Sequence, residues 1–171
     1  MELLLAAAAL FLVGLVLLTA AGQRRRAVGL PPGRIIYTDT SKWQALEKPL
    51  YDPISQLTGR PDYLVKKGGR IIPVEVKSGQ APAAPYHSHI FQLVAYCMLV
   101  ERQYKTRPTH GLIHYGSRTF AVDYTPALEE ALLDLLTEMR QSEALENVDR
   151  SHLDAARCRG CGYQYACDQT I

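Results

Sequence analysis

The chain opens with a long apolar run and continues with short apolar segments separated by turn residues. Residues 3–21 are apolar except for Gly14 and Thr19. At about 1.5 Å rise per residue, such a helix spans roughly 30 Å, which matches the hydrocarbon core of a bilayer. The three arginines at 24–26 follow the run instead of preceding it. This order favours an uncleaved anchor, with the rest of the chain in the cytoplasm, over a cleaved signal peptide.

We therefore expect a transmembrane anchor with a basic flank over residues 1–26, a Pro- and Gly-containing linker over 27–33, and one soluble domain over 34–171. The chain has 19 basic and 17 acidic residues; without Glu2 and the three arginines, 16 of each remain. The soluble part is formally neutral, which excludes a general polycation for nucleic acid. Any contact with phosphate must be local.

The most informative pattern is TGRPDYLVKKGGRIIPVEVKSG, residues 58–79. It predicts two strands joined by a tight turn at residues 66–69, with Arg60-Pro61-Asp62 opening the first strand and residues 71–77 forming the second. Successive side chains of a strand alternate between faces, so Glu75 and Lys77 share one face. Asp62, on the paired strand, can reach the same face.

Two carboxylates and a lysine in this arrangement are typical of a hydrolytic metal site. A hard cation such as Mg²⁺ prefers oxygen ligands, which Asp62 and Glu75 would supply together with the carbonyl of Val76. Lys77 would orient or help deprotonate the attacking water, or stabilise charge on the phosphate. The alternative is a solvated surface pair. The strand is otherwise apolar, however, and ionisable residues on such a strand point to a function.

A helix is predicted from Ser88, as N-cap, to about Tyr104. His89, Gln92 and Tyr96 fall at i, i+3 and i+7, on one face, where they would contact substrate or order the waters of the metal. The alternative is that Tyr96 is an edge-of-core residue. The neighbouring apolar face carries Cys97, which we expect to be buried.

The remaining segments complete an α/β pattern. We expect strands at residues 34–38, 111–115 and 118–124, one or two helical turns at 41–47, and a second helix that starts at Thr125-Pro126. Together these elements predict a small mixed sheet flanked by helices.

Three cysteines lie close together near the end of the chain: Cys158, Cys161 and Cys167. In a cytoplasmic domain this spacing favours metal ligands over disulfides. A [4Fe–4S] cluster or a structural Zn²⁺ normally needs four ligands. The fourth could be an outside ligand or His152, and a metal-free remnant also remains open.

Three of these motifs carry a resemblance to a known family. G-R-P-D followed by P-V-E-V-K resembles the PD-(D/E)XK nuclease superfamily, and within it the Cas4 family of CRISPR-associated exonucleases. Gln92-Leu93-Val94-Ala95-Tyr96 is similar to the Q-x-x-x-Y motif of that family, and the cysteines are similar to its C-terminal cluster. The resemblance implies a restriction-endonuclease-like core, Mg²⁺ or Mn²⁺, and a [4Fe–4S] cluster. It also implies DNA as substrate, single-stranded or with free ends, and partners in CRISPR adaptation or a role in DNA repair.

The chain departs from the family upstream of the hairpin. Cas4 proteins usually carry a cysteine and a metal-binding histidine there, whereas no cysteine or histidine precedes His87 in this sequence. Glu47 could replace the histidine, or be an ordinary surface residue.

The sequence thus predicts a membrane-anchored, divalent-metal-dependent DNA nuclease, with Asp62, Glu75, Lys77, Gln92 and Tyr96 as its catalytic residues. One alternative is a membrane-tethered adaptor that keeps the nuclease fold, binds nucleic acid or a protein, and cuts nothing. Another is a small iron–sulfur redox protein.

Overall fold

The computed structural model describes residues 2–27, 34–38 and 49–171. The contacts divide the chain into two compact units, Met1–Leu133 and Asp134–Ile171. The predicted helical turns at 41–47, and Glu47 with them, lie outside the described residues. The domain boundaries predicted from the sequence stay a prediction.

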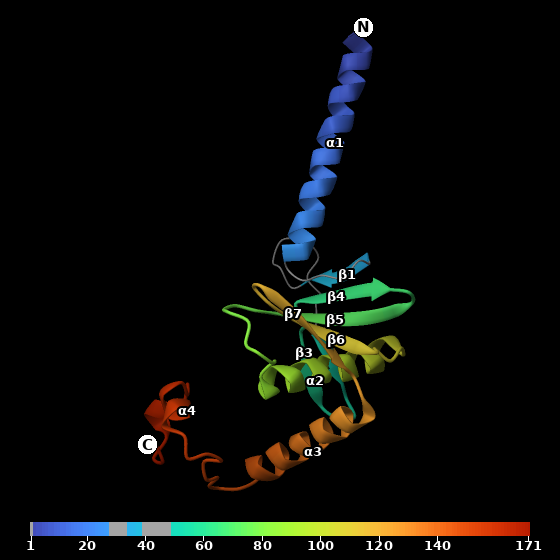
Figure 1. Cartoon of the computed structure of the whole chain (residues 1–171). Helices are drawn as coiled ribbons and strands as arrows, with labels where there is room; N and C mark the ends of the chain where they lie inside the picture. Colours follow the sequence, from blue (N-terminus) through green and yellow to red (C-terminus); the bar gives the residue numbers. More distant parts are fainter. Residues whose placement is uncertain (1, 28–33, 39–48) are drawn as a thin grey trace. The chain divides into compact units, whose positions relative to one another are not determined.

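A five-stranded sheet forms the centre of the first unit (Figure 1). Its strand order is β1-β4-β5-β6-β7. Only the β5–β6 pair is parallel; the other neighbours are antiparallel. The prediction of a mixed α/β fold is therefore confirmed. The bounds are Arg34–Thr38 (β1), Tyr63–Lys67 (β4), Arg70–Lys77 (β5), His110–Tyr115 (β6) and Arg118–Asp123 (β7).

The β4–β5 hairpin differs in detail from the prediction. Its turn consists of Gly68 and Gly69, with φ of 57° and 78°, and the two lysines predicted in the turn belong to β4. A two-residue turn with positive φ at both positions matches the right-handed twist of the strands, which is why two glycines set it. Asp62 precedes β4 instead of lying within its first residues.

A second, two-stranded sheet pairs β2 (Leu50–Asp52) with β3 (Leu57–Gly59), and the sequence did not predict it. Its hairpin connection is closed by the buried Asp52 carboxylate, which accepts hydrogen bonds from the backbone N–H and the hydroxyl of Ser55 at 3.1 and 2.6 Å. The β2–β3 hairpin packs on helix α2 (His87–Tyr104).

Helix α2 links the parallel strands β5 and β6 and packs on both of them. The predicted N-cap, Ser88, is wrong. The N-cap is Tyr86, whose carbonyl accepts the N–H groups of His89 and Ile90, both at 3.0 Å. Backbone groups therefore close the first turn without a side-chain cap. Helix α3 (Pro126–Glu143) begins as predicted, because the Thr125 hydroxyl accepts the N–H of Leu128 at 3.2 Å.

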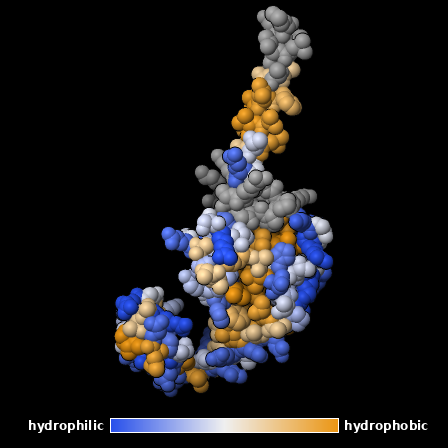
Figure 2. Space-filling view, in the orientation of Figure 1, coloured by the Kyte–Doolittle hydropathy of each residue, from blue (hydrophilic) through white to orange (hydrophobic). Residues whose placement is uncertain are grey.

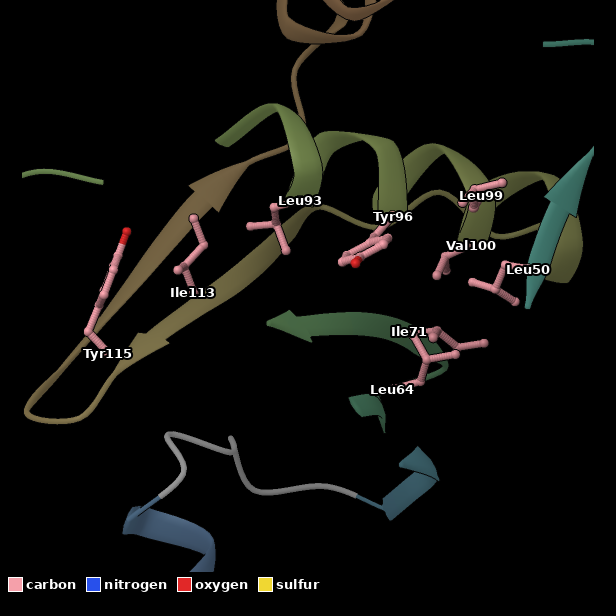
Figure 3. Close-up of a cluster of buried hydrophobic side chains, with 9 residues drawn as sticks. All are labelled: Leu50, Leu64, Ile71, Leu93, Tyr96, Leu99, Val100, Ile113 and Tyr115. Carbon is pink, nitrogen blue, oxygen red and sulfur yellow. The ribbon is translucent and has the colours of Figure 1, made fainter. Parts of the chain in front are cut away.

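The core lies between the large sheet, α2 and β2 (Figure 3). Two glycines let these layers approach closely. A Cβ on Gly111 would lie 2.6 Å from Leu93, and one on Gly59 would lie 2.8 Å from the Tyr96 ring. The buried side chains of this cluster are Leu50, Leu64, Ile71, Leu93, Tyr96, Leu99, Val100, Ile113 and Tyr115. A smaller cluster, Val65, Ile72, Val74 and Leu112, covers the other sheet face.

Residues Glu2–Ala27 form helix α1. The apolar side chains described along it are exposed, among them Leu10 at 74% and Leu18 at 73% (Figure 2). Over residues 2–27, 34–38 and 49–171, no helix is both long and apolar enough to cross a membrane.

Candidate active site

The ends of β4 and β5 bring the predicted acidic residues together. Tyr63 pairs with Val74, so Asp62 and Glu75 come next on the two strands. The Asp62 Oδ2 accepts the backbone N–H of Val76 at 2.6 Å. This bond holds the Asp62 carboxylate beside the strand segment that carries Glu75. The juxtaposition expected from the sequence is present, although Asp62 enters from the residue before the strand.

Lys77 lies at the centre of a hydrogen-bond network. Its Nζ is 2.8 Å from Glu75 Oε1 and 2.6 Å from Gln92 Oε1. Gln92 Nε2 in turn donates to Glu75 Oε1 at 3.0 Å and to the Tyr96 hydroxyl at 2.8 Å. The network joins the C-terminal end of β5 to one face of α2. Four of the residues predicted as catalytic are therefore in direct contact.

Electrostatics within this network oppose a bare negative charge on Glu75. Burial raises the pKa of Glu75, and the charge of Asp62 adds to the rise, while the hydrogen bonds from Lys77 and Gln92 oppose it. Two carboxylates placed close together in a partly dry site favour a shared cation, because the cation removes their mutual repulsion. The site is built to gain from a bound positive charge.

Tyr96 serves both the core and the site. Its ring is buried in the cluster beneath α2, while its hydroxyl accepts from Gln92. Burial, with a contribution from the charge of Glu75, raises the pKa of Tyr96 to about 12. The hydroxyl is therefore neutral near pH 7 and can act as a hydrogen-bond donor. The catalytic and the edge-of-core interpretations of Tyr96 are both compatible with this position.

The sequence did not reveal Tyr115 as a neighbour of the site. The parallel pairing of β5 with β6 places Tyr115 beside Lys77, and the Tyr115 hydroxyl lies 2.7 Å from His89 Nδ1. Burial and the nearby charge of Lys77 lower the pKa of His89. The only sequence signal is that Tyr115 ends a predicted strand; its partner strand depends on long-range topology.

The donor set at this site fits a hard divalent cation. Asp62 and Glu75 are carboxylates and Val76 adds a backbone carbonyl, and Mg²⁺ and Mn²⁺ prefer oxygen ligands of these kinds. Across the described ranges, no group of three or more His, Cys, Asp or Glu side chains is arranged to hold a metal ion. The proposed site has two such side chains, so waters and substrate oxygens would complete the shell, as is usual for Mg²⁺.

The C-terminal cysteines surround a small pocket of about 140 Å³. Cys158 is buried on α4 (Ala155–Arg159), while Cys161 and Cys167 are exposed, and all three are free thiols. The Cys161 Sγ accepts the N–H of Tyr163 at 3.4 Å. In the part of the chain that the structure describes, the thiols do not form an assembled metal site. The pocket is lined by Arg150, His152, Cys158, Cys161, Tyr163, Gln164, Cys167 and Thr170.

The fourth cysteine, Cys97, lies on helix α2 in the first unit. It is buried in α2 at 1% exposure, and burial raises its pKa to about 12. Burial and a raised pKa are typical of an inert core thiol. The prediction that Cys97 belongs to the core is confirmed.

Comparison with known proteins gives a family match. The model of the PD-(D/E)XK nuclease superfamily matches residues 19–168. No curated protein matches the chain. Among solved structures, the crystal structure of SSO0001 is similar, with a TM-score of 0.46 and 20% identity over 67% of this chain and 52% of that chain. The chain spans about half the length of that solved protein.

Proposed function

Because the chain belongs to the PD-(D/E)XK nuclease superfamily, we propose that it is a divalent-metal-dependent DNA exonuclease of the Cas4 type. The observation that carries the proposal is the contact of Glu75, Lys77 and Gln92 beside Asp62. This arrangement places two carboxylates, one cation and one neutral hydrogen-bonding side chain at the ends of two paired strands. Each of these kinds of group can contribute to phosphodiester hydrolysis, by holding a metal ion or by stabilising charge on the phosphate.

Asp62, Glu75 and the carbonyl of Val76 would hold Mg²⁺ or Mn²⁺. The bound ion would lower the pKa of a coordinated water and neutralise charge on the attacked phosphate. The hydrogen bond from Val76 N–H fixes Asp62 Oδ2 in place. Preorganisation of this kind lowers the cost of arranging ligands when substrate arrives.

Besides the metal ion, the ammonium group of Lys77 supplies a positive charge at the site. An ammonium group has three N–H donors, and Glu75 and Gln92 accept two of them. The third donor is available for a phosphate oxygen or the attacking water. Lys77 therefore orients the reacting group and stabilises the charge that develops on it.

Gln92 and Tyr96 support these residues from helix α2. Gln92 contacts Glu75, Lys77 and Tyr96 at once, so it fixes the relative position of the carboxylate and the ammonium. Tyr96 fixes the amide of Gln92 from the core side. Both residues position the site and meet substrate at its edge.

We further propose that the C-terminal cysteines bind a [4Fe–4S] cluster, with Zn²⁺ as the alternative. The support is that Cys158, Cys161 and Cys167 line one pocket together with His152. Soft thiolates favour both metals, and binding would tie down a chain end that would otherwise fray.

The membrane location and the biological partners rest on the sequence alone. From the apolar run at residues 3–21 and the three arginines that follow it, we propose that the N-terminal segment anchors the protein, with the nuclease in the cytoplasm and partners in CRISPR adaptation or DNA repair. The full chain should then remain in the membrane fraction after a carbonate wash. Release into the supernatant, or an N-terminus processed near Gly22, would contradict the anchor.

A substrate panel tests the proposed activity. The purified chain is incubated with Mn²⁺ or Mg²⁺ and with linear single-stranded DNA, linear duplex, circular duplex or RNA. We expect cleavage of DNA that has free ends, and none in EDTA. Cutting of circular DNA would indicate an endonuclease, and cutting of RNA alone would change the substrate class. Binding of DNA without any cleavage would favour the adaptor.

A further inference from the structure

The tip of the β4–β5 hairpin concentrates positive charge. Lys66, Lys67 and Arg70 lie within five residues, and all three are exposed. Within the described part of the chain, no carboxylate forms an ion pair with any of them. Lys77 and Arg107, in contrast, are both paired with glutamates. The hairpin tip therefore holds cations that are free to meet an external anion.

Two of these cations lie directly opposite each other. The strand register pairs Lys67 with Arg70 across the turn, so their side chains point to the same face. Like charges at directly opposed positions of an antiparallel pair destabilise the hairpin. In a domain with equal numbers of basic and acidic residues, a repulsive pair at this position gains from an anion that binds between the two side chains.

The turn itself leaves room for such an anion. Gly68 and Gly69 have no neighbouring heavy atom within 4 Å of where a Cβ would be. A phosphate can therefore approach the bare backbone as well as the flanking cations. Lys66 adds charge on the other face, the face of Ile71 and Glu75, since it pairs with Ile71.

A continuous strand ladder connects this tip to the candidate active site. The paired residues run without interruption from Lys67–Arg70 to Tyr63–Val74, next to Asp62 and Glu75. Four residues at about 3.3 Å each give a separation of roughly 13 Å. Both faces of the ladder between these two ends are buried, by Leu64 and Ile71 on one face and Val65 and Ile72 on the other, so nucleic acid bound at the tip lies apart from the catalytic residues.

We propose that Lys66, Lys67 and Arg70 form a nucleic-acid backbone clamp that binds the phosphates of the substrate at the hairpin tip, apart from the catalytic residues. The clamp rests on the proposed nuclease function and adds to it the contact that compensates for the neutral charge of the domain. It recognises phosphate and not bases, so its contribution is independent of sequence and sensitive to salt.

The test uses a charge reversal that separates binding from stability. In Lys67→Glu, the repulsive pair with Arg70 becomes an attractive one, so the melting temperature should equal or exceed that of the parent. Affinity for a fluorescein-labelled duplex, measured by anisotropy on the full chain in Ca²⁺, should nevertheless fall. Lys67→Arg keeps the charge and should bind like the parent.

Salt dependence provides the quantitative readout. Between about 50 and 200 mM NaCl, each lost phosphate contact reduces the slope of log K against log salt by about 0.9 on duplex DNA. The double variant Lys67→Gln/Arg70→Gln should lose about 1.8, equally for duplexes of unrelated sequence. An unchanged slope and affinity in this variant would overturn the clamp.

Three further outcomes identify the source of any failure. Cleavage of DNA by a parent whose affinity does not depend on Lys67 would refute the clamp and leave the proposed function standing. Binding that depends on Lys67, without any cleavage, would do the reverse. If the double variant kept its affinity for DNA but no longer bound phosphatidylcholine vesicles that contain phosphatidylserine, the cations would bind a membrane surface and the clamp would be wrong.

Discussion

Replacing Glu75 by glutamine should stabilise the metal-free protein while destroying its response to metal. The residue is only 7% exposed, and burial followed by the charge of Asp62 raises its pKa. Glutamine has nearly the same shape and can still accept from Lys77 Nζ, but it carries no charge. The substitution therefore removes the cost of a buried carboxylate and keeps the hydrogen bond.

The sign of the pH dependence follows from the direction of the shift. The folded protein binds a proton on Glu75 more tightly than the unfolded chain does. In the unfolded chain the carboxyl group of Glu75 has its ordinary pKa of 4.5. The stabilising contribution of this group is therefore lost as pH rises from that value through the raised one. Each pKa unit of difference corresponds to about 1.4 kcal/mol. In EDTA, Glu75→Gln should lack this decline and melt at or above the parent near pH 7.

Bound metal should raise the Tm of the parent above that of Glu75→Gln, which reverses their order in EDTA. A ligand at a hundred times its Kd stabilises the folded state by about 2.7 kcal/mol. At roughly 2–4 °C per kcal/mol for a chain of this size, Mn²⁺ should raise the Tm of the parent by about 5–11 °C. Glu75→Gln should gain little.

Thermal melts in EDTA and in Mn²⁺, across a pH series, measure both effects. The control is Glu130→Gln, the same chemical change at an exposed position on α3, which should leave both curves unchanged. If Mn²⁺ raised the Tm of Glu75→Gln as much as it raises the Tm of the parent, Glu75 would not be a metal ligand. If Glu75→Gln melted at a much lower temperature than the parent in EDTA near pH 7, the electrostatic reasoning would be refuted.

Three other changes probe the remaining parts of the molecule. Lys77→Met should slow DNA cleavage about 10²–10⁴-fold and leave Mn²⁺ binding intact, because the lysine acts on the reacting group; an unchanged rate would exclude that role. Gly59→Ala places a Cβ 2.8 Å from the Tyr96 ring, so urea unfolding should show a loss of about 1–3 kcal/mol. Cys161→Ser should abolish the brown colour of anaerobically purified protein, whereas Cys97→Ser should keep it; a colourless parent containing one equivalent of zinc would replace the cluster by a zinc site.

The sequence predicted those parts of the site that depend on local geometry. Glu75 and Lys77 share a face because strand side chains repeat every two residues, and Gln92 meets Tyr96 because helix residues four apart are neighbours. The apolar neighbours of Cys97 on its helix face predict its place in the core. These inferences need only the type of element and the spacing within it.

Other features depend on contacts between distant segments and could not be predicted. Tyr115 reaches His89 because β5 and β6 pair in parallel, a register that no local pattern specifies. Gly111 is needed because Leu93 of α2 packs directly on β6. Residue type favours Ser88 as N-cap, but the carbonyl of Tyr86 already closes the first turn two residues earlier.

The most direct test of the proposed active site is the rate at which end-labelled linear DNA is cleaved by the full chain, beside Asp62→Asn and Glu75→Gln. With saturating Mn²⁺ we expect cleavage by the parent alone, and no cleavage by any of the three proteins in EDTA. Cleavage in EDTA, or cutting by Asp62→Asn at the rate of the parent, would contradict a metal-dependent site built on these two carboxylates.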